Sequence, residues 1–261
     1  MTANIVAPLR FQSVRDGVSP EEWKARVDLA ACYRLADYYG WTHLIYSHIS
    51  MRVPNEPNHF LINPFGFMLR EITASCLVKV DLDGNKVDDT PYDISKPSFI
   101  IHSAVQGARP NVNCAMHIHT VAGMAVSALK CGLLPITQGA MKFYNRIGYH
   151  DYEGNALYLD ERPRIAASLG EAYALILRNH GLLTVGRTVS EAFYYMYHLE
   201  KSCAAQLAAM ACNTELLVQP PEVAEKSAAE GQRWEQKLNR GEESWPALLR
   251  MIDARDPSYR D

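Results

Sequence analysis

Apolar side chains recur with the period of an α-helix in the segment that follows residue 19. Ser19 is suited to the N-cap, Pro20 to the first turn and Glu22 to the third position of a capping box. Gly40 is placed to end the helix. The apolar positions of this repeat are Trp23, Val27, Ala30, Ala31, Leu35 and Tyr38. We therefore predict an amphipathic helix over residues 20–39.

Shorter apolar runs, bounded by turn residues, predict strands further along the chain. Residues 42–54 and 59–66 are two such runs separated by the polar sequence NEPN, which is typical of a hairpin with a long loop. Residues 74–82 predict a third strand, followed by a tight turn at Asp83 and Gly84. The remaining predicted strands cover residues 112–119 and 173–181.

Helical patterns alternate with these strands. The helical segments cover residues 97–108, 120–130, 162–170 and 190–211. Thr120 is a suitable N-cap for the second of them and Ser190 for the last. Because the order does not give regular βαβ units, we predict a single α/β domain in which a mixed, largely antiparallel central sheet is flanked by helices.

We place this domain at residues 19–212, between an N-terminal arm of residues 1–18 and a C-terminal helical arm of residues 213–261. The segment after Cys212 is polar and is interrupted by Pro220 and Pro221. We therefore expect the C-terminal arm to lie on the surface of the domain or on a neighbouring subunit.

The composition narrows the classes of function. A chain of 261 residues with a formal net charge of −3 and no dense cluster of Lys and Arg argues against nucleic acid or an anionic membrane as a required partner. No stretch approaches the ~18 consecutive apolar residues of a membrane span. The six cysteines include no CxxC pair, and the first residues lack the pattern of a signal peptide. We therefore expect reduced thiols and a cytoplasmic protein.

The sequence CAMHIHTVAG, residues 114–123, places two histidines one residue apart in an apolar run. In an extended chain His117 and His119 point to the same side. Two neutral imidazoles so placed can chelate a metal ion, although an isolated H-x-H is also compatible with the polar face of a half-buried strand. Cys114 is interpreted as a core residue, because it would need a bulge to share that face.

A third histidine ends another apolar run, in the sequence ALILRNHGLLTVG. His180 follows the predicted strand, and Gly181 permits a sharp turn after it. Strand ends are where chemistry is usually found in α/β proteins. Three imidazoles with an open position would describe a catalytic rather than a structural metal centre.

Together these stretches resemble the class II aldolase/adducin family over roughly residues 23–210. The segments FIIHSAVQGARPNVNCAMHIHTVAGMAVSALKCGLLPI, GYHDYEG and ILRNHGLLTVGRTVSEAFYYMYHLE are more similar to the head domain of adducin than to the sugar-phosphate aldolases. The resemblance implies a three-layer α/β/α fold. It also implies that His117, His119 and His180 bind a catalytic divalent cation, for which we expect Zn²⁺, with Mn²⁺, Co²⁺ or Fe²⁺ as alternatives.

One catalytic position departs from the aldolases of this family. They carry a glutamate four residues before the histidine that corresponds to His102, and this chain has Ser98 there. A serine hydroxyl stays protonated near neutral pH and offers no charge to the ion. His102 itself lies among apolar helix residues, and we interpret it as a core histidine with satisfied hydrogen bonds.

The phosphate-binding turns of the aldolases also differ here, so a sugar phosphate is not the expected substrate. They correspond to Ser47-His48, Phe65-Gly66 and Lys96-Pro97, where most small hydroxyl and amide donors are absent. An aromatic or carboxylate-bearing small molecule fits better. The predicted substrate-binding residues are His48, Asn63, Phe65, Gly66, Lys96 and Arg146. The alternative for Lys96 and Arg146 is a solvated surface charge, and for His48 simple packing.

These features predict a divalent-metal-dependent lyase for a small keto- or hydroxy-carboxylate. Retro-aldol cleavage and decarboxylation share a metal-bound enolate, and Tyr144 is the candidate proton donor. Two alternatives stay open: a catalytically silent, adducin-like binding or scaffold protein, and a non-haem iron oxygenase on the same fold.

We also expect a homotetramer with the metal pocket near a subunit boundary, as the resemblance implies. The residues 193–197 add modest support, because the aromatic side chains there exceed what one side of a helix can bury.

Overall fold

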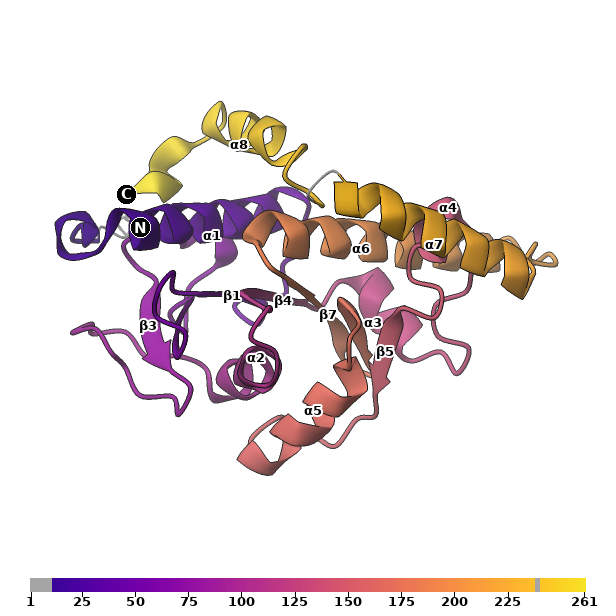
Figure 1. Cartoon of the computed structure of the whole chain (residues 1–261), viewed down its shortest axis with the longest axis horizontal. Coiled ribbons are helices and arrows are strands. Elements are labelled where there is room, and N and C mark those ends of the chain that lie inside the picture. The colour runs from indigo at the N-terminus through magenta and orange to yellow at the C-terminus, as the bar shows by residue number, and fades with distance from the viewer. Residues whose placement is uncertain (1–10, 238–239) are drawn as a thin grey trace, which may run out of the picture.

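The computed structural model describes residues 11–237 and 240–261 (Figure 1). The described strands are β1 (His48–Arg52), β2 (His59–Ile62), β3 (Val78–Asp81), β4 (Cys114–Ile118), β5 (Ile147–His150), β6 (Ala174–Leu177) and β7 (Gly181–Gly186). Within this part of the chain the seven strands form one sheet in the order β3-β2-β1-β4-β7-β6-β5. Neighbouring strands run antiparallel, except β5 and β6, which are parallel.

Helices cover both faces of this sheet. The α-helices are α1 (Pro20–Tyr38), α2 (Lys96–Ala108), α3 (Val121–Ser127), α4 (Gln138–Met141), α5 (Arg162–Leu169), α6 (Val189–Ala211), α7 (Pro221–Lys237) and α8 (Trp245–Asp253). The 3₁₀ helices are η1 (Arg15–Gly17), η2 (Leu69–Glu71), η3 (Leu159–Glu161) and η4 (Pro257–Arg260). α1 and α6 lie on one face and α2 and α5 on the other (Figure 1). This confirms the predicted fold, an α/β domain with a mixed, largely antiparallel sheet between helices.

Alternation along the strands sorts their side chains between the two faces. Met116 in β4 and Ile49 in β1 pack in the hydrophobic core that α1 and α6 share with the sheet. Their neighbours His117, His48 and Ser50 therefore face the side of α2. Polar groups from two adjacent strands are thus brought together on one face.

The signals at the start of the first helix are partly confirmed. The Ser19 hydroxyl accepts a hydrogen bond of 3.1 Å from the backbone N–H of Glu22, as predicted. The second half of the capping box is wrong, because the Glu22 carboxylate accepts hydrogen bonds from Arg26 and Lys79 instead. Ion pairs with these two cations replace the expected hydrogen bond from the backbone N–H of Ser19.

Two other predicted element starts also differ from the structure. α6 is capped by Thr188 rather than Ser190, and the Thr188 side chain accepts from the backbone N–H of Glu191. The first strand begins at His48 instead of residue 42. The preceding segment bends at Leu44, whose φ of 50° no strand residue adopts.

The predicted strand over residues 173–181 is confirmed over Ala174–Leu177, but it ends earlier than predicted because the chain reverses after it. β6 ends at Leu177, and residues 178–180 form the turn into β7. Asn179 has a φ of 54°, in the left-handed region that asparagine adopts more readily than most residues. The sequence pattern predicted neither β7 nor β5.

The C-terminal segment packs against its own domain. α7 contacts α4, and α8 contacts α1 (Figure 1). The backbone N–H groups of Ala74 and Ser75 donate hydrogen bonds of 2.9 Å to oxygens of Tyr259 and Asp261, and the Tyr259 side chain is fully buried. The described residues of the predicted C-terminal arm therefore lie on the domain of their own chain. Of the predicted N-terminal arm, residues 1–10 lie outside the described part.

Within the described ranges, no helix combines the length and the apolar composition that crossing a membrane requires.

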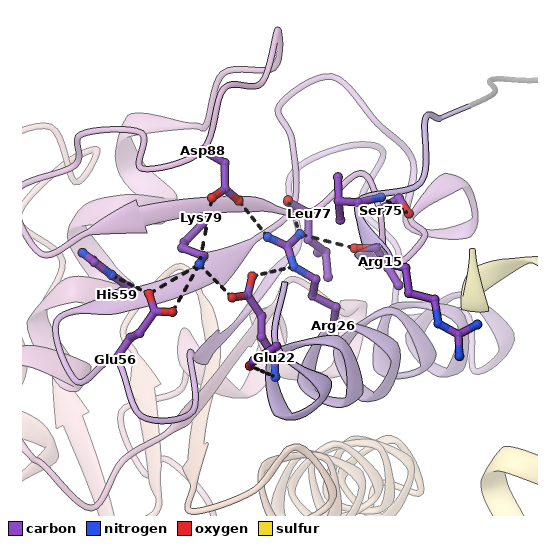
Figure 2. Close-up of polar contacts among 12 residues, drawn as sticks. Arg15, Glu22, Arg26, Glu56, His59, Ser75, Leu77, Lys79 and Asp88 are labelled. Carbon is purple, nitrogen blue, oxygen red and sulfur yellow. Dashed lines mark hydrogen bonds and ion pairs between the residues drawn. The ribbon is translucent and has the colours of Figure 1, made fainter. Parts of the chain in front are cut away.

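A buried charge cluster of Glu22, Arg26 and Lys79 joins α1 to the sheet (Figure 2). The Arg26 Nε donates to the Glu22 carboxylate at 2.8 Å, and its Nη1 donates to the carbonyl of Leu77 at 2.8 Å. The Lys79 Nζ donates to the other oxygen of Glu22 at 2.7 Å. Asp88 pairs with Arg26 at 2.8 Å from the outer side. Each buried charge thus has a partner of opposite sign, as burial requires.

Arg26→Ala should lower the free energy of unfolding by about 3 kcal/mol or more, because the buried Glu22 carboxylate loses one of its two cationic partners and the carbonyl of Leu77 loses its donor. Urea denaturation followed by circular dichroism measures the loss. Lys24→Ala is the matched control on the same helix, since Lys24 is exposed and its ion pair with Asp28 is worth less than ~1 kcal/mol. Equal losses in both variants would contradict a structural role for the cluster.

Candidate metal centre

Three imidazoles meet at one end of the central strands, where β4 ends and β7 begins. The Nε2 atoms of His117 and His119 are 2.7 Å apart. The Nε2 of His180 lies 3.3 Å from that of His117 and 3.0 Å from that of His119. Among the described residues, these three form the one group of histidine, cysteine or carboxylate side chains whose ligand atoms all lie within 4.8 Å of one another.

Strand pairing explains this convergence. His117 lies in β4, and His119 follows the end of that strand. β4 pairs with β7 so that Ile118 is opposite Leu182. His180 precedes β7 by one residue, and the antiparallel register therefore places it beside His119. Two segments separated by about sixty residues reach one point because the two strands are direct neighbours.

Contacts behind the ligand atoms fix the rings. The Nδ1–H of His117 donates a hydrogen bond of 2.8 Å to the carbonyl of Leu182, which leaves its Nε2 lone pair free to bind a cation. The backbone N–H of His180 donates to the Ser127 hydroxyl at 3.2 Å. The turn that carries His180 is thereby held against α3.

Gly181 is required by the close packing of the rings. A β-carbon at this position would lie 2.6 Å from the carbonyl oxygen of Ile118 and 2.9 Å from Cδ2 of His119. It would also lie 3.4 Å from Cε1 of His117. The absent side chain therefore leaves room for two of the three imidazoles, which is a role the sequence pattern did not assign to this glycine.

The electrostatics keep the three rings neutral. Burial lowers the pKa of His117 well below its ordinary value, and the neighbouring imidazoles His119 and His180 lower it further. Burial lowers the pKa of His119 to about 3 and also lowers that of His180. Near neutral pH the ring nitrogens are therefore free of added protons and available as ligands.

The donor set fits a divalent cation. Four ligands at the Zn–N distance of 2.0–2.1 Å define a tetrahedron with edges of about 3.3 Å. The three nitrogen-to-nitrogen distances of the cluster, 2.7 to 3.3 Å, lie close to that edge length. His117, His119 and His180 would occupy one face of the tetrahedron, and the fourth corner would stay available to a substrate.

Three further groups adjoin the cluster. His48 pairs with His117 in the sheet, and the centroids of the two rings are 4.9 Å apart. The Nδ1 of His48 lies 2.8 Å from the Nε2 of His102, and the Nδ1 of His102 lies 2.5 Å from the Ser50 hydroxyl. Both nitrogens of the fully buried His102 have partners, which confirms it as a satisfied core histidine.

Sequence reasoning missed two aromatic groups near the cluster. The Nδ1 of His43 lies 3.3 Å from the Nδ1 of His119. The Tyr152 ring, which follows β5, packs edge-on to His180 with centroids 6.5 Å apart. His43 had no motif to mark it. Tyr152 follows β5, a strand that the sequence pattern did not predict, so no signal marked this residue either.

The other predicted substrate-binding residues are dispersed. Asn63 is buried and accepts a hydrogen bond of 2.7 Å from the Tyr33 hydroxyl, whereas Phe65 and Lys96 are exposed. Gly66 has a φ of 93°. Ser98 is buried in the first turn of α2, one helical turn before His102 and on the same side of the helix.

Tyr144 and Arg146 are not brought to the cluster within one chain. Both precede β5, which pairs with β6 so that Ile147 lies opposite Ala174, at the far end from His180. The Arg146 guanidinium binds Glu225 of α7 at 2.7 Å. Their predicted roles in substrate binding and proton donation stay predictions.

Comparison with known proteins identifies the family. A family model described as Class II Aldolase and Adducin N-terminal domain matches residues 27–207. The chain belongs to the class II aldolase/adducin family. This confirms the predicted membership, and the matched residues include all three histidines of the cluster.

Individual relatives of this aldolase/adducin protein include bacterial and animal chains. A solved structure of an aldolase II superfamily protein from Pseudomonas syringae has 47% identity and a TM-score of 0.87, and the match covers 96% of this chain and 100% of that one. Alpha-adducin of Rattus norvegicus is 42% identical over 97% of this chain and 36% of its own length. L-fuculose 1-phosphate aldolase from Glaciozyma antarctica PI12 has 28% identity and a TM-score of 0.79, with 98% and 97% coverage.

Gly181→Ala should weaken the retention of a divalent cation by about tenfold or more, because the added methyl would press on the Ile118 carbonyl and on the His119 ring and shift that imidazole. Titration with Zn²⁺ against a competing chelator measures the affinity. Gly231→Ala is the control, since no atom lies within 4 Å of its added β-carbon. Unchanged affinity in Gly181→Ala would contradict the packing requirement.

Proposed function

We propose that this aldolase/adducin family member is a divalent-metal-dependent lyase that acts on a small keto- or hydroxy-carboxylate. The observation that carries the proposal is the meeting of the Nε2 atoms of His117, His119 and His180 at one point. Three neutral nitrogen ligands with a fourth position open are typical of catalytic metal sites, whereas structural sites are closed by four protein ligands.

A divalent cation held there supplies Lewis-acid stabilisation of negative charge on substrate oxygens. The chain's own groups position the substrate around it. His48 presents its ring beside His117, and the exposed Tyr152 stands at the edge of His180. We add Tyr152 to Tyr144 as a candidate for the phenol that delivers a proton, since proton transfer needs a donor within reach of the reacting carbon.

Ser98 favours decarboxylation over aldol cleavage. Retro-aldol cleavage begins when a base removes a proton from a substrate hydroxyl, and a buried serine cannot serve as that base. Decarboxylation needs no base to begin, only protonation of the product carbon afterwards. The chemistry of this position therefore supports a keto acid more strongly than a hydroxy acid.

The surroundings also support a carboxylate rather than a sugar phosphate. The fuculose phosphate aldolase relative acts on a phosphorylated sugar by its name. In this chain Phe65 offers an exposed apolar ring, and the Asn63 amide nitrogen donates a hydrogen bond of 3.2 Å to the carbonyl of Pro64. Phe65 provides no donor for a phosphate, and the donor of Asn63 already has an acceptor, which favours a small carboxylate over a sugar phosphate.

Zn²⁺ is the proposed ion, because imidazole nitrogen in tetrahedral geometry is a preferred zinc environment. Mn²⁺, Co²⁺ and Fe²⁺ share the same ligands with lower selectivity. Iron in the purified protein, with oxygen-dependent turnover, would favour the non-haem oxygenase instead. A protein that retains no metal would favour a silent binding or scaffold role, for which the 42% identity to alpha-adducin is the supporting observation.

His117→Ala should abolish stoichiometric metal retention, whereas Cys114→Ala should leave it intact. Cys114 is buried in the same strand but belongs to the hydrophobic core on the opposite face. Elemental analysis of both variants and the wild type, purified without chelator, measures the metal per chain. Stoichiometric metal in His117→Ala would contradict the proposed centre.

The zinc-loaded protein should release CO₂ from keto acids whose carboxylate is β to the ketone, or an aldehyde from keto acids that carry a hydroxyl β to the ketone, and chelator should stop the release. Coupled detection of the two products separates decarboxylation from aldol cleavage. Sugar phosphates serve as the comparison set. Turnover confined to the sugar phosphates would contradict the proposed substrate class.

We also propose a homotetramer, although the aromatic residues of α6 do not argue for it. Phe193 and Tyr195 are buried within their own chain. A different surface supports assembly: the segment after β5 exposes large apolar side chains, and exposed apolar patches often mark interfaces. These side chains are Tyr152, Leu157, Tyr158 and Leu159.

Light scattering at micromolar concentration should give about four times the chain mass of 29.3 kDa. A single-chain mass would contradict the tetramer. Tyr158→Ser is the informative variant, because this ring is 71% exposed and its loss should weaken assembly without unfolding the chain.

A further inference from the structure

A line of hydrogen bonds runs from the interior of the sheet to the histidine cluster. Ser50 and His102 are fully buried, and His48 is 6% exposed. The Ser50 hydroxyl contacts Nδ1 of His102 at 2.5 Å, and Nε2 of His102 contacts Nδ1 of His48 at 2.8 Å. All three groups therefore form one linear chain, which we call the Ser50–His102–His48 chain.

The direction of these hydrogen bonds follows from the Ser50 end. Among the described residues, the one hydrogen-bond partner of the Ser50 hydroxyl is His102. A buried hydroxyl proton without an acceptor is costly, so the hydroxyl donates and His102 Nδ1 accepts. A neutral imidazole carries a single N–H. That proton of His102 is then on Nε2, which donates to Nδ1 of His48.

The same rule fixes the proton of His48. With Nδ1 occupied as an acceptor, the neutral ring carries its proton on Nε2. No described residue accepts a hydrogen bond from this nitrogen. Burial lowers the pKa of His102 to about 3, and His48 is buried with its Nδ1 paired to that neutral ring, which supports neutral rings at both positions.

The ring of His48 lies beside the cluster. His48 and His117 are directly opposite in the antiparallel pair, so their side chains share one face of the sheet. Their ring centroids are 4.9 Å apart. His48 does not belong to the group whose ligand atoms converge, so it is a neighbour of the three histidines and not one of them.

We propose that Ser50 and His102 hold His48 as the Nε2–H tautomer, so that His48 donates a hydrogen bond to a carboxylate or carbonyl oxygen of a ligand bound at the cluster. His48 is then a specificity-determining donor for small oxyanions and not a fourth metal ligand. Ser50 and His102 are positioning residues that act through it. The inference rests on the proposed function for the ligand, but the tautomer is a property of the chain itself.

Nitrogen-15 NMR of the histidine rings tests the tautomer directly, in both the metal-free and the zinc-loaded protein. We expect the proton on Nε2 in both His48 and His102. Ser50→Ala should redistribute the proton of His102 between its two nitrogens, and Ser50→Thr, which retains the hydroxyl, should restore the wild-type signature. A wild-type His48 with its proton on Nδ1 would overturn the proposal.

Oxalate, a small dicarboxylate, serves as the probe for the donor. Calorimetric titration of the zinc-loaded protein should show about tenfold or more weaker oxalate binding in His48→Phe, since a hydrogen bond to a charged group is lost. His48→Gln, whose amide N–H replaces the donor, should recover part of the affinity. Zinc stoichiometry should be unchanged in both variants.

The outcomes separate this inference from the proposed function. Unchanged oxalate affinity in His48→Phe overturns the donor role while leaving the metal centre intact. Loss of zinc from His48→Phe and His48→Gln alike would make His48 a ligand and also overturn it. Wild-type protein that binds no zinc counts against the proposed function alone, because the ring tautomers of the metal-free protein still decide the inference.

Discussion

The candidate site depends on one constraint, the antiparallel pairing of β4 with β7. This register sets Ile118 opposite Leu182, so that the residues just beyond both strands meet. It also gives His117 its hydrogen bond to the Leu182 carbonyl. A slip of one residue would turn His117 to the opposite face of the sheet and replace its imidazole with an apolar side chain. Hydrophobic packing on both faces of the sheet holds this register, and the register in turn fixes the geometry of the site.

The cost of burying polar groups is met differently in the charge cluster beside α1 and in the histidines of the candidate site. Glu22, Arg26 and Lys79 are charged, and each is matched by an opposite charge, which anchors α1. The histidines around the cluster avoid charge instead, because burial and mutual proximity lower their pKa values. Neutral buried rings must still satisfy their N–H groups, and this need fixes the tautomers of His117 and His102. Because each ring is neutral, it carries a single proton, and its hydrogen-bond partners decide which nitrogen holds that proton.

The sequence allowed the convergence of the three histidines and the layered α/β fold to be predicted, because H-x-H and N-H-G are local motifs and the resemblance to the family brought the two motifs together. It did not reveal the reversal at Asn179, since an apolar run looks the same whether it forms one strand or two. The contacts of His102 with His48 and Ser50 join segments about fifty residues apart, and no local pattern encodes them. Tyr144 and Arg146 show the same limit: nearness in the sequence to a site loop did not place them at the cluster.

The loss of the carboxylate at Ser98 changes the charge that a bound cation presents. A divalent ion held by three neutral imidazoles would keep both of its positive charges, whereas a glutamate beside it would offset about one of them. An ion that retains its full charge favours an anionic ligand at the open position, and coulombic attraction is strong where water is excluded. The hydrogen-bond donor at His48 adds to the same preference. Both features favour a small carboxylate. The first of them follows from Ser98, which would otherwise indicate an inactive site.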